Sequence, residues 1–203
     1  MMDKQMWPRL GAASGMLFVA LLLGGESLPL ADVVPWELFG LILFVPFLGY
    51  LFAVLRQAEG GDGWLSATAL GAGLVALAVK LASFAPFIAA REAGAGTQIE
   101  GALIAMNNAS FILTLAPLGV MAAAASALII RTGALPVWLG WAGAVTACAL
   151  LVNSAFLNAE FGPAFILFLL WTVLTSAIMT RRAGAARTKG STGPASVRPE
   201  PVR

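Results

Sequence analysis

Lys80 is the residue of this sequence whose type and position could do chemistry most readily. It lies in an apolar stretch, residues 64–90, that is long enough to span a bilayer as one helix. We expect it about ten residues from the outer end of that helix, or about 15 Å at 1.5 Å per residue. A lysine at that depth costs about 2.5–3.5 kcal/mol on insertion scales, so something should offset the cost. Ionisable side chains inside a membrane commonly mark binding or translocation sites.

Amide and hydroxyl side chains on later helices could supply that partner. If residues 64–90 and 100–130 form an antiparallel hairpin, Lys80 faces the region of Ser110, and its ammonium can lean outward to an amide oxygen. We expect no acid at the depth of Lys80, so a purely structural polar cluster is the alternative interpretation. The pattern predicts a ligand-binding polar cluster, in a pocket open to the outside, of Lys80, Asn107, Asn108, Ser110 and Asn153, with Ser83, Thr114, Asn158 and Glu160 nearby.

The residue types that are missing exclude much catalytic chemistry. The sequence has no histidine and one cysteine, Cys148. Histidine-ligated haem, histidine-containing zinc sites and histidine proton relays therefore cannot form, and one thiol cannot make an internal disulfide or an iron–sulfur site. Lipid-active enzymes usually need converging Asp, Glu, His or Cys, and the acids here are peripheral. We expect no catalytic residue, no metal site and no cofactor.

The elements that must position Lys80 are membrane helices. Hydrophobic residues make up 60% of the 203 residues, charged residues 11%, and the mean hydropathy is +0.89. Such a chain has too little polar surface for water, so the fold class is an all-α polytopic membrane bundle. We expect six transmembrane helices, arranged as three successive helical hairpins, with kinks at Pro46, Pro86 and Pro117. Their approximate bounds are 8–25, 36–56, 64–90, 100–130, 136–159 and 163–180.

The distribution of Lys and Arg predicts the orientation. With the N-terminus inside, ten basic residues fall in cytoplasmic segments, and only Arg91 falls in an outer loop. This bias places both termini in the cytoplasm and the protein in the cell membrane. Residues 1–180 form the transmembrane domain. Residues 181–203, rich in Gly, Pro, Ser and basic residues, are predicted to be a disordered basic cytoplasmic tail.

Small residues spaced four apart could let helices approach closely. The pairs are Gly11 with Gly15, Ala69 with Gly73, and Gly140 with Ala144. They could pack helices within one chain or form a homo-oligomer. The expected partners are membrane lipids and either a second copy or another membrane protein. No basic face exists outside the tail, so no nucleic acid is expected.

Two stretches carry a resemblance to a known group of proteins. One is MNNASFILTLAPLGV followed by the motif R-T-G-x-L-P-x-W-L-G-W, and the other is the turn LRQAEGGDGWLS. They resemble a group of uncharacterised bacterial six-helix integral membrane proteins whose domain has no known function. The resemblance covers about residues 1–180 and implies the six-helix fold, but it lends no catalytic residues.

Together these patterns favour a non-enzymatic membrane protein. The function expected is a transporter-like or binding module, or an accessory subunit, with the pocket at Lys80 as its site. The alternatives are a lipid-active intramembrane enzyme and a purely structural subunit of a larger membrane complex.

Overall fold

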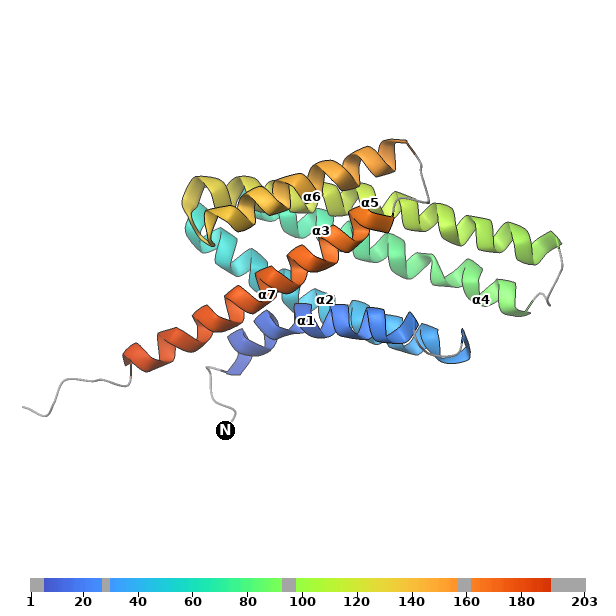
Figure 1. The fold of residues 1–203 in the computed structure, drawn as a ribbon, viewed down its shortest axis with the longest axis horizontal. Helices are drawn as coiled ribbons and strands as arrows, with labels where there is room; N and C mark the ends of the chain where they lie inside the picture. The colour runs from blue at the N-terminus through green and yellow to red at the C-terminus, as the bar shows by residue number, and fades with distance from the viewer. Residues whose placement is uncertain (1–5, 27–29, 93–97, 157–161, 191–203) are drawn as a thin grey trace, which may run out of the picture.

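The computed structural model describes residues 6–26, 30–92, 98–156 and 162–190, and these ranges are helical apart from short turns. The helices are α1 (Met6–Glu26), α2 (Leu30–Glu59), α3 (Trp64–Ala82), α4 (Phe84–Glu92), α5 (Gln98–Thr132), α6 (Val137–Ala155) and α7 (Gly162–Gly190) (Figure 1). Because α4 continues α3, the seven helices form six rods.

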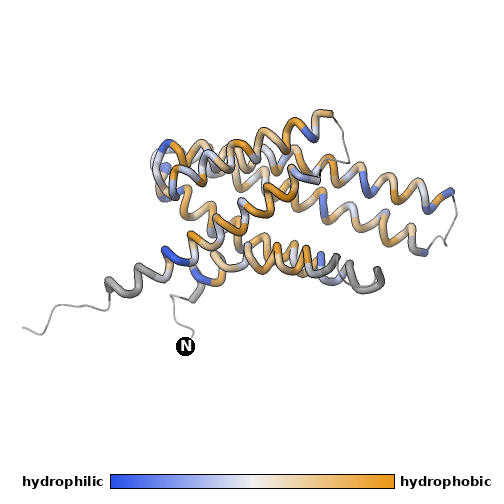
Figure 2. Tube along the Cα trace, viewed as in Figure 1, coloured by the Kyte–Doolittle hydropathy of each residue, from blue (hydrophilic) through white to orange (hydrophobic). Residues whose placement is uncertain are grey.

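Length and composition identify candidate membrane spans among these rods. Five of them are long and apolar enough to cross a bilayer, and α1 contains a shorter apolar stretch, Arg9–Gly24. Figure 2 shows hydrophobic residues along most of each rod and several hydrophilic residues near the ends. The predicted all-α membrane bundle is therefore confirmed.

The six rods pack as a closed ring in chain order. Helix α1 packs on α2, α2 on α3, α3 with α4 on α5, α5 on α6, α6 on α7, and α7 returns to α1. The first two hairpins, α1–α2 and α3/α4–α5, are closely packed pairs, as the sequence predicts. In the third, α6 packs most heavily on α5, while α7 leans across the bundle to α1 (Figure 1).

Pro86 interrupts the third rod. A proline clashes with the carbonyl four residues earlier and donates no hydrogen bond, so α3 ends at Ala82. Ser83 closes the helix by donating its backbone N–H to the Val79 carbonyl (3.1 Å) and its hydroxyl to the Lys80 carbonyl (2.7 Å). Pro46 and Pro117 lie within the continuous helices α2 and α5.

Helix α7 extends further than the sequence indicates. It continues to Gly190, past the boundary at residue 181 between the bundle and the predicted tail. Residues 191–203 of that tail lie outside the described residues.

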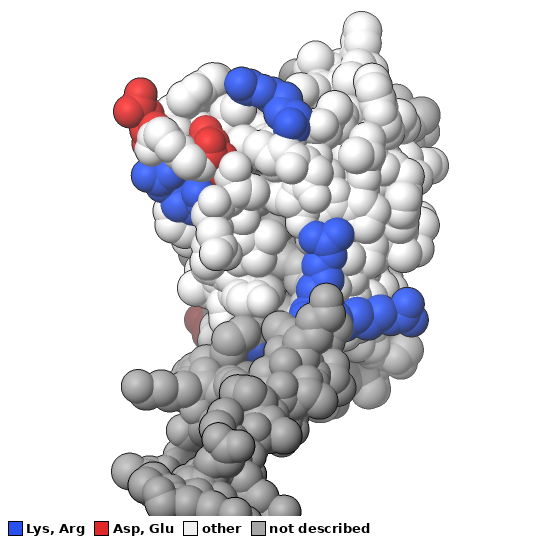
Figure 3. Space-filling model, turned by 90° about the vertical axis from the view of Figure 1, so that its left-hand side faces the viewer, with Lys and Arg blue, Asp and Glu red and all other residues white. Residues whose placement is uncertain are grey.

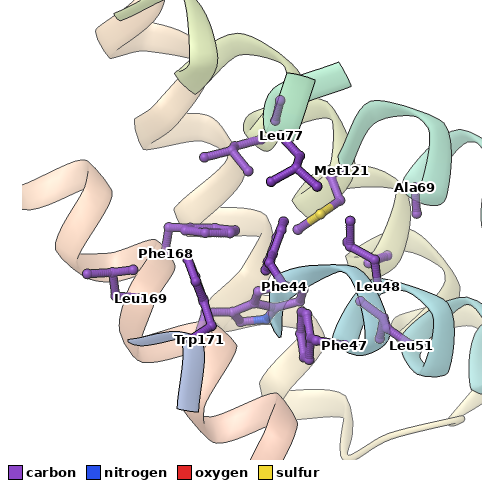
Figure 4. Close-up of a cluster of buried hydrophobic side chains, with 14 of the residues drawn as sticks. Phe44, Phe47, Leu48, Leu51, Ala69, Leu77, Met121, Phe168, Leu169 and Trp171 are labelled. Carbon is purple, nitrogen blue, oxygen red and sulfur yellow. The ribbon is translucent and has the colours of Figure 1, made fainter. Parts of the chain in front are cut away.

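An aromatic cluster packs inside the ring between α2 and α7. Phe44, Phe47, Phe168 and Trp171 are nearly fully buried and come from α2 and α7 (Figure 4). The Phe44 ring centroid lies 5.6 Å from that of Phe47 and 6.2 Å from that of Phe168. The Trp171 indole donates a hydrogen bond to the Leu139 carbonyl (3.1 Å), which ties α7 to α6. This buried donor is therefore satisfied.

The small residues let these helices approach within the chain. A Cβ at Gly15 would lie 2.5 Å from the Phe47 ring on α2, and one at Gly73 would lie 2.7 Å from Leu48. At Gly143 on α6, it would lie 2.5 Å from the Trp171 indole nitrogen. These glycines therefore serve packing inside one chain.

Candidate functional site

Lys80 has an acidic partner that the sequence analysis did not anticipate. Its Nζ lies 3.5 Å from Oε2 of Glu37 on α2. The Lys80 side chain is 20% exposed and the Glu37 side chain is 18% exposed. The expectation of no acid at this depth is therefore wrong. It fails because α2 begins at Leu30, not near residue 36, which places Glu37 about 10 Å inside the helix at 1.5 Å per residue.

Two phenylalanine rings complete the surroundings of the ammonium. Nζ lies 5.3 Å from the ring centroid of Phe84 on α4 and 5.7 Å from that of Phe111 on α5. Both distances are within the range of cation–π attraction. Lys80 on α3 is thus held by groups from three other helices. Partial desolvation of the ammonium is offset by one carboxylate and two aromatic faces.

A pocket lies inside the ring next to Lys80. It has an empty volume of about 400 Å³, open mouth included, and five of the six rods line it; α6 contributes no lining residue. Its lining is apolar except for Lys80 and Thr114, and the Thr114 hydroxyl is engaged with the Ser110 carbonyl (2.9 Å). Lys80 is the one charged residue of the lining, and the surface that the lining exposes to the pocket is apolar. The lining residues are Phe18, Leu22, Leu41, Phe44, Ala76, Leu77, Lys80, Phe111, Thr114, Leu118, Phe165 and Phe168.

The other residues of the predicted polar cluster lie elsewhere. Asn107 is half-buried and Asn108 is exposed on α5, and the Ser110 hydroxyl donates to the Met106 carbonyl of its own helix (2.9 Å). Asn153 is buried on α6, where its side-chain oxygen has no hydrogen-bond partner among the described residues. None of these four lines the pocket. A ligand-binding role for them stays a prediction, and Asn158 and Glu160 lie outside the described residues.

Sequence reasoning missed the residues that surround Lys80 most closely, which are Glu37, Phe84 and Phe111. Glu37 could have been predicted as a partner only if the start of α2 at Leu30 had been known, because that start places the acid within the membrane span and not in the preceding loop. The rings carry no comparable signal, since phenylalanine occurs throughout the apolar helices. Among the described residues, no three His, Cys, Asp or Glu side chains gather into a group that could hold a metal ion.

The fold and the pocket define a multi-pass helical membrane protein with a largely apolar interior pocket beside a Lys–Glu ion pair. Comparison of the chain with family models, with curated proteins and with solved structures finds no match. The assignment to this class therefore depends on the helices and the pocket.

Proposed function

We propose that this protein is a non-enzymatic membrane module that binds a small, mostly apolar ligand in the central pocket. The polar end of the ligand lies at Lys80. The observation that carries the proposal is the pocket itself, which sits inside a ring of packed helices, has an apolar surface and includes one charged residue, Lys80, in its lining. Ligand sites of helical bundles are commonly built between the helices, from apolar side chains with a few polar groups.

The ion pair supports a ligand-binding role over a structural one. A partly buried Lys–Glu pair is a weak source of stability, because an apolar pair of similar size is often as stable or more so. Charged residues within membrane spans are rare and usually functional. The ammonium also keeps hydrogen-bonding capacity, since it has three donors and Glu37 is its only ion-pair partner in the described part of the chain.

We further propose that both termini are cytoplasmic and that the pocket lies toward the outer face of the cell membrane. Five arginines of the described part gather at the end of the bundle where α2 ends and α3 begins, which Figure 3 views directly. The positive-inside rule assigns such an end to the cytoplasm. Lys80 lies in the last turn of α3, toward the other end. The arginines are Arg9, Arg56, Arg131, Arg181 and Arg182.

Filling the pocket tests the binding function. Ala76 is 1% exposed and lines the pocket, whereas Ala78 on the same helix is exposed, so Ala76→Leu and Ala78→Leu are a matched pair. The probes are an alkyl carboxylic acid carrying a diazirine and the matching alkyl alcohol, photolysed with the purified protein in nanodiscs. We expect Ala76→Leu to reduce labelling by both probes several-fold and Ala78→Leu to leave it unchanged.

The thermal midpoints of both variants control for folding. If Ala76→Leu is too unstable, Leu118→Phe fills the same pocket from α5. Equal labelling of the wild type and of a folded pocket-filled variant would contradict the proposal.

A further inference from the structure

A second pocket lies at the arginine-rich end of the bundle, far along α3 from Lys80. The turn from Glu59 to Trp64 forms one side, and Leu128, Arg131 and Thr132 near the end of α5 form the other. Its empty volume is about 630 Å³, open mouth included, and polar groups make up much of its lining. The central pocket, by contrast, is lined almost entirely by apolar side chains.

Side-chain hydrogen bonds stabilise the turn that forms this pocket. The Arg56 guanidinium donates to the carbonyls of Gly60 (2.9 Å) and Gly61 (3.0 Å). The Glu59 carboxylate accepts the backbone N–H groups of Leu65 (3.0 Å) and Ser66 (2.9 Å) at the start of α3. The charges of Arg56 and Glu59 are therefore engaged in fixing the turn.

Three glycines make this geometry possible. Gly60, Gly61 and Gly63 have φ angles of 62°, 46° and 68°, a region that other residues rarely adopt. A Cβ at Gly63 would also overlap the Arg56 side chain. The glycines permit this backbone geometry, and the hydrogen bonds of Arg56 and Glu59 stabilise it. A site formed before the ligand binds lowers the ordering cost of binding.

Two opposite charges remain available in the pocket. Asp62 at the tip of the turn and Arg131 on α5 are both exposed, and neither has a hydrogen bond or ion pair within the described residues. The Thr132 hydroxyl donates a hydrogen bond to the Leu128 carbonyl (2.7 Å) and accepts one from the Ala134 N–H (3.2 Å). The pocket therefore offers one free carboxylate and one free guanidinium on opposite sides.

We propose that this pocket binds the headgroup of a zwitterionic aminophospholipid of the inner leaflet. The phosphate lies at Arg131, whose planar guanidinium suits bidentate phosphate binding, and the primary ammonium lies at Asp62. Asp62 would repel a purely anionic headgroup, and Arg131 would repel a purely cationic ligand. Trp64 begins α3 at 64% exposure, and an indole there is placed for the membrane interface.

Native mass spectrometry of the full chain tests the proposal. The protein is released from bilayers containing equal amounts of phosphatidylethanolamine, phosphatidylcholine and phosphatidylglycerol, and the retained lipids are counted. We expect phosphatidylethanolamine to be retained over the other two. Asp62→Asn should reduce this preference by about tenfold, the effect of one charge-assisted hydrogen bond. Arg131→Gln should lower the retention of all three lipids.

Control variants separate this site from general charge effects and from the central pocket. Arg181→Gln removes an exposed arginine of the same end that does not line the pocket, and Ala76→Leu fills the central pocket; both should leave the headgroup preference unchanged. Thermal midpoints show that each variant is folded.

Three results would overturn the proposal. One is an unchanged preference in folded Asp62→Asn. Another is equal retention of phosphatidylcholine by the wild type, because its quaternary ammonium has no N–H to donate to Asp62. The third is displacement of the lipid by soluble glycerophosphoethanolamine at an equal concentration, which would make the occupant a soluble zwitterion.

Discussion

The Lys80–Glu37 pair makes a quantitative prediction, because each charge is the main compensation for the other. Lys80→Met keeps most of the side-chain length and removes the ammonium, which leaves Glu37 inside the span without its cation. An uncompensated charge at the bilayer centre costs about 2.5–3.5 kcal/mol, and removing one partner of a fully buried pair costs about 3–5 kcal/mol. Here both side chains keep about one-fifth of their exposure, so we expect a smaller loss, about 1–3 kcal/mol.

The double variant separates pairing from other effects. Glu37→Gln alone should also destabilise the protein, because it leaves the ammonium with two aromatic faces and no carboxylate. Lys80→Met with Glu37→Gln should lose less than the sum of the single variants, with a coupling energy of about 1–2 kcal/mol. The free energy of unfolding is measured in bicelles by steric trapping, with Glu92→Gln as an exposed control. Additive losses, or two neutral single variants, would refute the argument that the charges compensate each other.

Two further predictions concern orientation and packing. On intact cells, with Cys148 replaced, a cysteine at Glu92 should react with an impermeant thiol reagent and one at Asp62 should not; outside labelling at Asp62 would reverse the orientation. Gly143→Ala should destabilise the protein by about 1–3 kcal/mol, since the added methyl group overlaps the side chains packed there, whereas Gly71→Ala, which meets no atom within 4 Å, should be neutral or slightly stabilising in the same unfolding assay.

The helices could be predicted from the sequence because long apolar runs have few alternatives. Proline geometry predicts a kink at Pro46, Pro86 and Pro117 alike, yet only Pro86 follows a helix end, while Pro46 and Pro117 lie within continuous helices. The sequence therefore does not say at which proline the helix breaks.

The start of α2 could not be predicted from the sequence. Pro35 and Trp36 indicate a helix start near residue 36, yet the helix begins at Leu30. The earlier start places Glu37 within the helix, beside Lys80.

The residues that line the central pocket could not be predicted from the sequence, for a different reason. Its helices are apolar on nearly every side, so hydrophobic periodicity does not say which face turns inward. Lys80 stood out because charge is rare in a span, and it does line the pocket. Phe18 and Phe168, in contrast, lie far apart in the sequence, and both line the pocket beside the Phe44 ring of α2.

The site at which a bound ligand labels the protein tests the central claim most directly. The alkyl carboxylic acid carrying a diazirine is photolysed with the wild-type protein in nanodiscs, and the modified residues are identified by peptide mass spectrometry. We expect adducts on pocket-lining residues of two helices, at Leu77 of α3 and Phe111 of α5, and their loss in Ala76→Leu. Adducts confined to outward-facing residues such as Leu113, unchanged in Ala76→Leu, would contradict ligand binding in the central pocket.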